Sequence, residues 1–125
     1  MDWYKQSAVA GNSVAQANVG AAYGQGEGVD QDWAKSFYWY HRSAKQGFAL
    51  GLHNLGVAFA NGRGVSTDYA ESYKWYILAL EATPASDLIG RHLILRNIEN
   101  VLKFLSPGEV DFANQIAKNW QPKNE

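Results

Sequence analysis

A glycine-rich stretch at residues 24–28, Gly-Gln-Gly-Glu-Gly, is the segment that most resembles a phosphate-binding loop. Such loops bind phosphate through backbone N–H groups, and they need a preceding strand, a G-x-G-x-x-G spacing or a following Lys-Ser/Thr pair. None of these accompanies residues 24–28, and a similar loop recurs at residues 62–65. The recurrence favours a structural turn over a nucleotide site.

The histidines and serines are the candidate metal ligands and nucleophiles of the chain. His41, His53 and His92 lack the short, fixed spacing of metal-binding pairs. Ser43 and Ser72 fall at small-residue positions of a helical repeat, which argues against nucleophilic roles, and no motif joins a serine, a histidine and a carboxylate. We therefore expect no catalytic residue, no metal ligand and no cofactor.

Composition limits the remaining classes of function. The 125-residue chain has a formal net charge of −1, no cysteine and no clustered basic stripe, so we expect no nucleic-acid partner and no disulfide. No apolar run approaches the ~20 residues that span a bilayer, and the first residues lack the basic and apolar regions of a signal peptide. We expect a soluble single domain without membrane insertion.

The sequence repeats itself at an offset of 36 residues. The pair Trp-Tyr occurs at residues 3–4, 39–40 and 75–76. Other residues that return after 36 positions are Gly11 as Gly47, Asn18 as Asn54, Gly20 as Gly56, and Gly26-Glu27-Gly28-Val29 as Gly62-Arg63-Gly64-Val65. A fixed period of this length indicates a solenoid, in which each unit buries its apolar face against its neighbours.

Each period contains two helices. Aromatic and small residues recur at three- and four-residue steps over residues 33–45, and Gly47 follows as a helix-ending residue. A second stripe over residues 52–59 stops at the next glycine loop. Asp32 and Asp68 are placed to cap the helices that follow them. Nothing indicates a strand, so the predicted fold is all-α.

Gly20 and Gly56 lie inside predicted helices, where glycine costs roughly 1 kcal/mol relative to alanine. Their recurrence in phase with the tryptophans predicts a close approach of helix backbones, with Trp39 or Trp75 lying across the missing side chain. The alternative is a tolerated glycine on a solvated face.

The second period reads Ala34-x-x-Phe37-x-Trp39-Tyr40-x-x-Ser43-Ala44-x-x-Gly47, then Leu55-Gly56-x-x-Phe59-x-x-Gly62-x-Gly64-Val65-x-x-Asp68. This order resembles the Sel-one-like repeat, a relative of the tetratricopeptide repeat, which has a period of about 34 and lacks the glycine loop. The resemblance implies a right-handed stack of antiparallel helix pairs that binds proteins, often in bacteria. The compartment stays open between bacterial cytoplasm and periplasm.

We therefore predict one domain, residues 1–125, folded as a right-handed αα-solenoid of about two and a half repeats plus a C-terminal capping pair. The expected parts are repeat one at 1–36, repeat two at 37–72, a partial third repeat at 73–82 and capping helices at 83–125. In the cap, Thr83-Pro84 and Ser106-Pro107 each have the N-cap and N1 residues of a helix start.

The expected core consists of residues at recurring positions of the 36-residue repeat: Trp39, Tyr40, Ala44, Leu55, Gly56, Phe59, Val65, Ala70, Trp75 and Tyr76. The side chains at the helix positions between these core residues should face outward. On the concave surface, lined by the first helix of each pair, these residues are Tyr38, His41, Arg42 and Lys45, joined by Lys74 and Ile77 from the third unit. They suit a protein or peptide partner with acidic and apolar character, although a solvated helix face is the alternative for any one of them.

Other functions were weighed against a non-catalytic interaction scaffold. One is hydrolase activity on cell-wall or β-lactam substrates, which has been attributed to some relatives, and another is a purely structural or oligomerisation segment of a longer array. The first helix has neither an aspartate cap nor a preceding repeat unit in this sequence, so apolar residues at the N-terminal face are expected to be poorly covered: Trp3, Val9, Val14 and Val19. This face is predicted to self-associate or to contact another molecule.

Overall fold

The computed structural model describes residues 2–125, which form seven α-helices and no strand. The helices are α1 (Asp2–Val9), α2 (Ser13–Gln25), α3 (Trp33–Lys45), α4 (Ala49–Asn61), α5 (Tyr69–Ala82), α6 (Leu88–Leu102) and α7 (Pro107–Asn119). The predicted all-α fold is confirmed.

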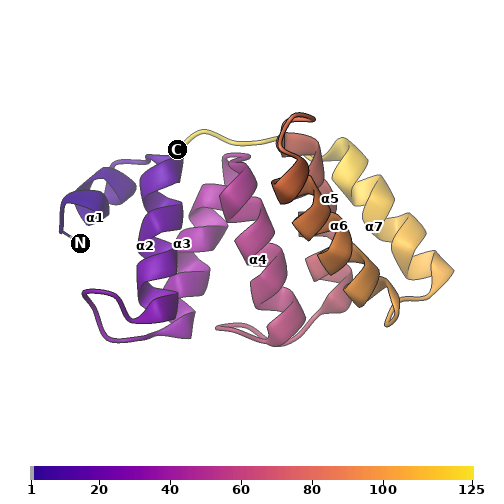
Figure 1. The fold of residues 1–125 in the computed structure, drawn as a ribbon, viewed down its shortest axis with the longest axis horizontal. Helices are drawn as coiled ribbons and strands as arrows, with labels where there is room; N and C mark the ends of the chain where they lie inside the picture. The colour runs from indigo at the N-terminus through magenta and orange to yellow at the C-terminus, as the bar shows by residue number, and fades with distance from the viewer. Residues whose placement is uncertain (1) are drawn as a thin grey trace.

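The helices form a row from α1 at one end of the molecule to α7 at the other (Figure 1). Each helix from α1 to α5 packs on the next one, and α2 also touches α4. At the C-terminal end α6 and α7 both pack on α5. The arrangement is an α-solenoid of helix pairs closed by two capping helices, as predicted.

Glycines with positive φ reverse the chain after α2 and after α4. The φ angles are 72° at Gly26, 74° at Gly28, 66° at Gly62 and 79° at Gly64, in the left-handed region that side chains disfavour. Gly64 is further constrained by packing, since a Cβ there would lie 2.2 Å from the carbonyl oxygen of Trp33. Both loops therefore depend on glycine for backbone conformation, and the second loop depends on it for space as well.

Capping side chains fix the starts of the helices at the predicted positions. Asp32 and Asp68 each accept a hydrogen bond from the backbone N–H three residues later. Ser106 and Glu109 form a reciprocal capping box at α7. These bonds satisfy amide groups that have no partner inside the helix.

The start of α6 differs from the prediction that placed it at Thr83 and Pro84. Thr83 instead ends α5, and its hydroxyl donates to the Ala79 carbonyl oxygen at 2.7 Å. Asp87 is the N-cap of α6, and its carboxylate accepts from the N–H of Gly90 at 2.9 Å. Thr83 therefore closes α5, and α6 begins only after a short turn, at the Asp87 cap.

Two mid-helix glycines allow a tyrosine of the next helix to lie against the backbone. A Cβ at Gly20 would be 2.9 Å from Cδ1 of Tyr40, and a Cβ at Gly56 would be 2.6 Å from Cδ1 of Tyr76. Both distances are shorter than a carbon–carbon contact permits. The close approach predicted at these glycines is present, and we call it the glycine–tyrosine contact.

The aromatic residue in this contact is the tyrosine, and the prediction of Trp39 or Trp75 was wrong. Adjacent helix residues point about 100° apart, because a turn contains 3.6 residues. Only one member of a Trp-Tyr pair can therefore face the glycine. Trp39 and Trp75 are buried in separate apolar clusters instead.

A serine hydrogen bond accompanies each glycine–tyrosine contact. Ser36 donates to the carbonyl oxygen of Gly20 and Ser72 to that of Gly56, both at 2.7 Å. Both serines are buried, where an unpaired hydroxyl would be costly. The same pair of interactions thus joins α2 to α3 and α4 to α5.

The core is continuous from α3 to α7, with a smaller cluster around Trp39 at the N-terminal end. Of the expected core residues, those that are buried are Trp39, Ala44, Leu55, Gly56, Trp75 and Tyr76. Those that are only half-buried are Tyr40, Phe59, Val65 and Ala70.

Substituting Gly56→Ala tests the glycine–tyrosine contact. Forcing a methyl group against Tyr76 is an overpacking that costs about 1–3 kcal/mol, which exceeds the gain of at most about 1 kcal/mol in helix propensity. We expect a lower free energy of unfolding, measured by urea denaturation. Gly108→Ala is the matched control, because a Cβ there meets only Ser106 Oγ at 4.0 Å. Equal or greater stability of Gly56→Ala would contradict the contact.

Candidate functional site

The five side chains predicted to bind a partner lie on two helices. Tyr38, His41, Arg42 and Lys45 follow one another along α3, and Lys74 comes from α5. All five are exposed or half-buried, and the charges of Lys45 and Lys74 both act on His41, so the two helices bring these groups together. We call this surface the α3–α5 face. Its role in binding stays a prediction.

The imidazole of His41 lies among aromatic rings. It stacks on Phe37, with ring centroids 5.8 Å apart, and meets the edge of Trp75 at 6.2 Å. Burial lowers the pKa of His41, and the two lysines of the face lower it further. The neutral imidazole is therefore favoured at pH 7, and the positive charge of the face comes from its arginine and lysines.

Lys74 is held by a carboxylate and an aromatic ring. Its Nζ lies 3.0 Å from Glu71 and 4.5 Å from the ring centroid of Trp75. The same carboxylate accepts a hydrogen bond from the indole Nε1 of Trp75 at 3.0 Å. Lys74 therefore has a fixed position, but Glu71 balances much of its charge.

Arg42 is the most highly connected cation of the face. Its guanidinium lies 5.0 Å from the ring centroid of Trp39 and 5.8 Å from that of Tyr38. It also donates to the backbone oxygen of Val9 and forms a two-point ion pair with Glu125, in which Nε donates to Oε2 at 3.0 Å. Arginine suits such planar, two-point recognition of a carboxylate.

Glu125 belongs to a segment that runs from α7 back to the first helices, shown in yellow at the top of Figure 1. We call residues 120–125 the C-terminal segment. At its start Trp120 meets Trp75 with ring centroids 6.0 Å apart. Further along, the backbone N–H of Lys123 donates to the carbonyl oxygen of Lys45 at 2.8 Å. The segment therefore lies along the α3–α5 face.

The carboxylate of Glu125 is held at the far end of this segment. The hydrogen bond from Arg42 is the main cause that lowers the pKa of the Glu125 carboxyl, and a hydrogen bond from Gln16 and the charge of Lys45 act in the same direction. Because the docked form has the lower pKa, docking is favoured above the ordinary carboxyl pKa. It weakens as the pH falls through the lowered value.

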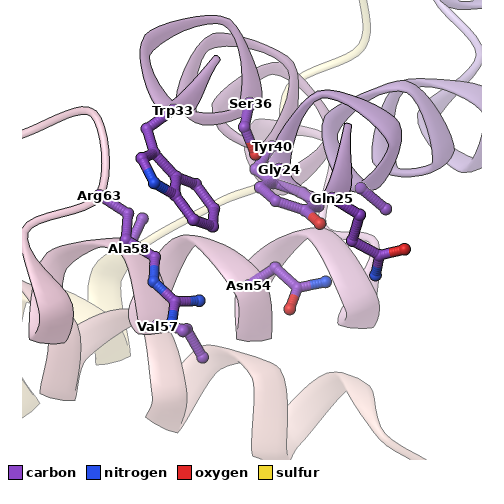
Figure 2. Close-up of a pocket in the computed structure, with 10 residues that line it drawn as sticks. Gly24, Gln25, Trp33, Ser36, Tyr40, Asn54, Val57, Ala58 and Arg63 are labelled. Atoms are coloured by element: carbon purple, nitrogen blue, oxygen red, sulfur yellow. The ribbon is translucent and has the colours of Figure 1, made fainter. Parts of the chain in front are cut away.

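A separate pocket of about 160 Å³ lies between α2, α3 and α4. Trp33, Tyr40, Asn54 and Arg63 point into it (Figure 2). The guanidinium of Arg63 lies 4.7 Å from the ring centroid of Trp33, and burial raises the pKa of Tyr40 to about 12. The pocket can hold a small apolar group beside hydrogen-bond donors.

A second pocket repeats the first one unit earlier in the chain. Five of its lining residues stand 36 positions before residues of the first pocket: Tyr4 for Tyr40, Asn18 for Asn54, Ala21 for Val57, Ala22 for Ala58 and Glu27 for Arg63. The recurrence of tyrosine and asparagine after 36 positions is the sequence signal for this repeated pocket. The two pockets carry opposite charges at the loop position.

The residues weighed as catalytic or metal-binding have structural contacts. The hydroxyls of Ser43 and Ser72 donate to backbone carbonyl oxygens at 2.7 Å, and His53 is 2.8 Å from the amide nitrogen of Asn97. Among residues 2–125, no three His, Asp or Glu side chains gather as metal ligands. Within the same residues, no helix has the length and apolarity to cross a membrane.

The N-terminal face exposes most of the predicted apolar residues. The exposed fractions are 80% for Trp3, 60% for Val9 and 49% for Val14. The prediction was wrong for Val19, which is fully buried because it faces the tryptophan cluster between α2 and α3. Self-association through this face stays a prediction.

The substitution Arg42→Gln tests the docking of Glu125. It removes the hydrogen bonds and the charge that lower the Glu125 pKa, so this pKa should rise toward the ordinary value. The measurement is an NMR titration of the side-chain carboxyl carbon. Arg96→Gln, on the exposed surface of α6, is the matched control and should leave the Glu125 pKa unchanged. An equal Glu125 pKa in all three proteins would show that the segment is not docked.

Comparison with solved structures places the fold among repeat proteins. The chain is similar to c5321, a protective antigen of uropathogenic Escherichia coli with an SLR fold, at 27% identity and a TM-score of 0.82 over 95% of this chain. The chain spans 24% of the length of that antigen. It is also similar to a Sel1 repeat protein from Oxalobacter formigenes, with 29% identity, a TM-score of 0.69 and coverage of 79% and 69% of the two chains.

No protein of curated function matches the sequence. The Sel1 repeat matches residues 13–48 and 49–83. These two ranges correspond to the pairs α2–α3 and α4–α5 and together cover more than half of the chain. Helix α1 precedes the first range, and the capping helices follow the second. The 36-residue repeat, the glycine loops and the helix pairs thus have one explanation: the chain belongs to the Sel1 repeat family.

Proposed function

We propose that this chain is a non-catalytic interaction scaffold that binds an extended, acidic segment of a partner protein on the α3–α5 face. The Sel1 repeat is a helical fold commonly used for protein–protein interaction. Solenoids of this kind offer a long surface formed by successive helices. The proposal adds the site and the chemistry of the partner.

The observation that carries the proposal is the contact between this face and the chain's own C-terminal segment. Arg42 receives the carboxylate of Glu125, and the carbonyl oxygen of Lys45 receives a backbone N–H. Recognition of an extended peptide uses the same elements, namely main-chain hydrogen bonds for affinity and a side-chain ion pair for specificity. A partner segment with a carboxylate would meet complementary groups.

Aromatic side chains give the face an apolar component. Tyr38 is 53% exposed and lies beside Arg42, and tyrosine and arginine are enriched among residues that dominate binding energy. The hydrolase alternative has no comparable support, because the hydroxyls of Ser43 and Ser72 are engaged with backbone oxygens.

The double substitution Tyr38→Ala and Arg42→Gln tests this function. Fluorescence anisotropy would measure binding of labelled ten-residue acidic peptides, with basic peptides of the same length as the reference. We expect the acidic peptides to bind more tightly, and the double variant to lose at least about tenfold in affinity, or ~1.4 kcal/mol. Its helicity by circular dichroism should be unchanged.

The matched control for this experiment is Arg96→Gln, which removes the same charge from another helix and should keep the affinity. Binding should also weaken with added salt, because exposed charges are screened. Equal affinity of the double variant and the original chain for acidic peptides would rule out the α3–α5 face.

The exposed N-terminal face supports a second, separate interaction. Trp3 and Val9 together with Val14 form an apolar end of the solenoid, and exposed apolar surface is typical of contact sites. We expect concentration-dependent dimerisation in sedimentation velocity, and Trp3→Lys should shift the equilibrium to monomer. A monomer at all concentrations, with or without the substitution, would contradict self-association.

A further inference from the structure

The C-terminal segment makes contacts of the kind that a bound peptide makes. Trp120 serves as an aromatic anchor on Trp75, and the Lys123 N–H forms the main-chain hydrogen bond to α3. Pro122 lies against Gly47, where an added Cβ would be 3.2 Å from the proline Cβ. Glycine at this position therefore leaves room for the segment.

The far end of the segment enters a site that the helices hold in place. Gln16 is fully buried, and its Nε2 donates both to the Ala8 carbonyl oxygen at 3.0 Å and to Glu125 at 2.9 Å. The Oε1 of Gln16 accepts from Gln46 at 2.9 Å, which fixes the direction of the amide. A buried, oriented donor beside Arg42 is a preformed receptor for a carboxylate.

The contacts are also weak enough to be exchanged. The side chains of Arg42 and Glu125 keep 20% and 23% of their surface exposed, so a competing carboxylate can reach the ion pair from solvent. The tether to α7 adds to these contacts, since a short tether gives an effective concentration in the millimolar range. A free peptide of higher affinity can therefore compete.

We propose that residues 121–125 are an internal ligand of the α3–α5 face, which the acidic segment of a partner must displace before it binds. This inference rests on the proposed function of that face. Its consequence is that partner affinity is reduced by the fraction of molecules in which the internal segment is docked. Release of the segment increases binding without any change in the helices.

The test compares the full chain with a variant that lacks residues 121–125. The probe is a synthetic peptide with the sequence of residues 121–125, acetylated and amidated, and its binding is followed by NMR at the amides of Gly11, Gln16 and Gly47. We expect the shortened chain to bind the peptide at least about tenfold more tightly than the full chain. Glu125→Gln in the full chain should raise its affinity for the added peptide.

Two substitutions identify the site of the peptide. Arg42→Gln in the shortened chain should remove binding, whereas Arg96→Gln in the same background should preserve it. A probe peptide with glutamine in place of its last glutamate should also fail to bind. If the peptide still binds after Arg42→Gln or after the loss of its own glutamate, the inference is overturned, because the peptide would then lie elsewhere.

The outcomes separate the two proposals. If the full and shortened chains bind acidic peptides equally, the internal ligand is wrong while the α3–α5 face remains a binding surface. If the shortened chain binds no acidic peptide although Glu125 of the full chain titrates with a lowered pKa, the proposed function fails, and the inference fails with it.

Discussion

The close approach of a tyrosine ring to a glycine backbone determines how the helices of this solenoid pack. At Gly20 and Gly56 the missing side chain makes room for Tyr40 and Tyr76, and a serine hydroxyl ties the same glycine carbonyl to the next helix. This contact fixes both the separation and the rotation of the paired helices. Once Tyr40 faces inward, helical geometry turns the side chains two positions away, Tyr38 and Arg42, about 200° from it, and these two residues form part of the α3–α5 face.

Local signals predicted most of the fold, because helix caps and left-handed glycines depend on a few neighbouring residues. Two of the failures arose where local signals compete. Thr83 and Asp87 are both good capping residues, and the structure places Thr83 at the end of α5 and Asp87 at the start of α6. The aromatic residue that meets each glycine depends on helix rotation, which adjacent tryptophan and tyrosine residues leave undetermined.

The site was predictable only in part, for a related reason. Side chains along one helix share a face by spacing alone, so the grouping on α3 followed from the sequence. The carboxylate that meets Arg42 comes from a position 83 residues later, and Gln16 lies 109 residues from the same carboxylate. The segment that carries it has no periodicity, and Pro122 prevents a helix there. Contacts of this kind require the three-dimensional path of the chain.

The glycine loops separate the requirements of folding from those of surface chemistry. In each loop two glycines carry the positive φ angles, and the residue between them has an ordinary backbone conformation. That middle residue is Glu27 in one loop and Arg63 in the other, and each lines the equivalent pocket of its unit. The same loop backbone therefore carries either a negative or a positive side chain between its two glycines. Each added repeat gives evolution, or a protein engineer, one position at which the charge beside a pocket can change while the two glycines keep the turn.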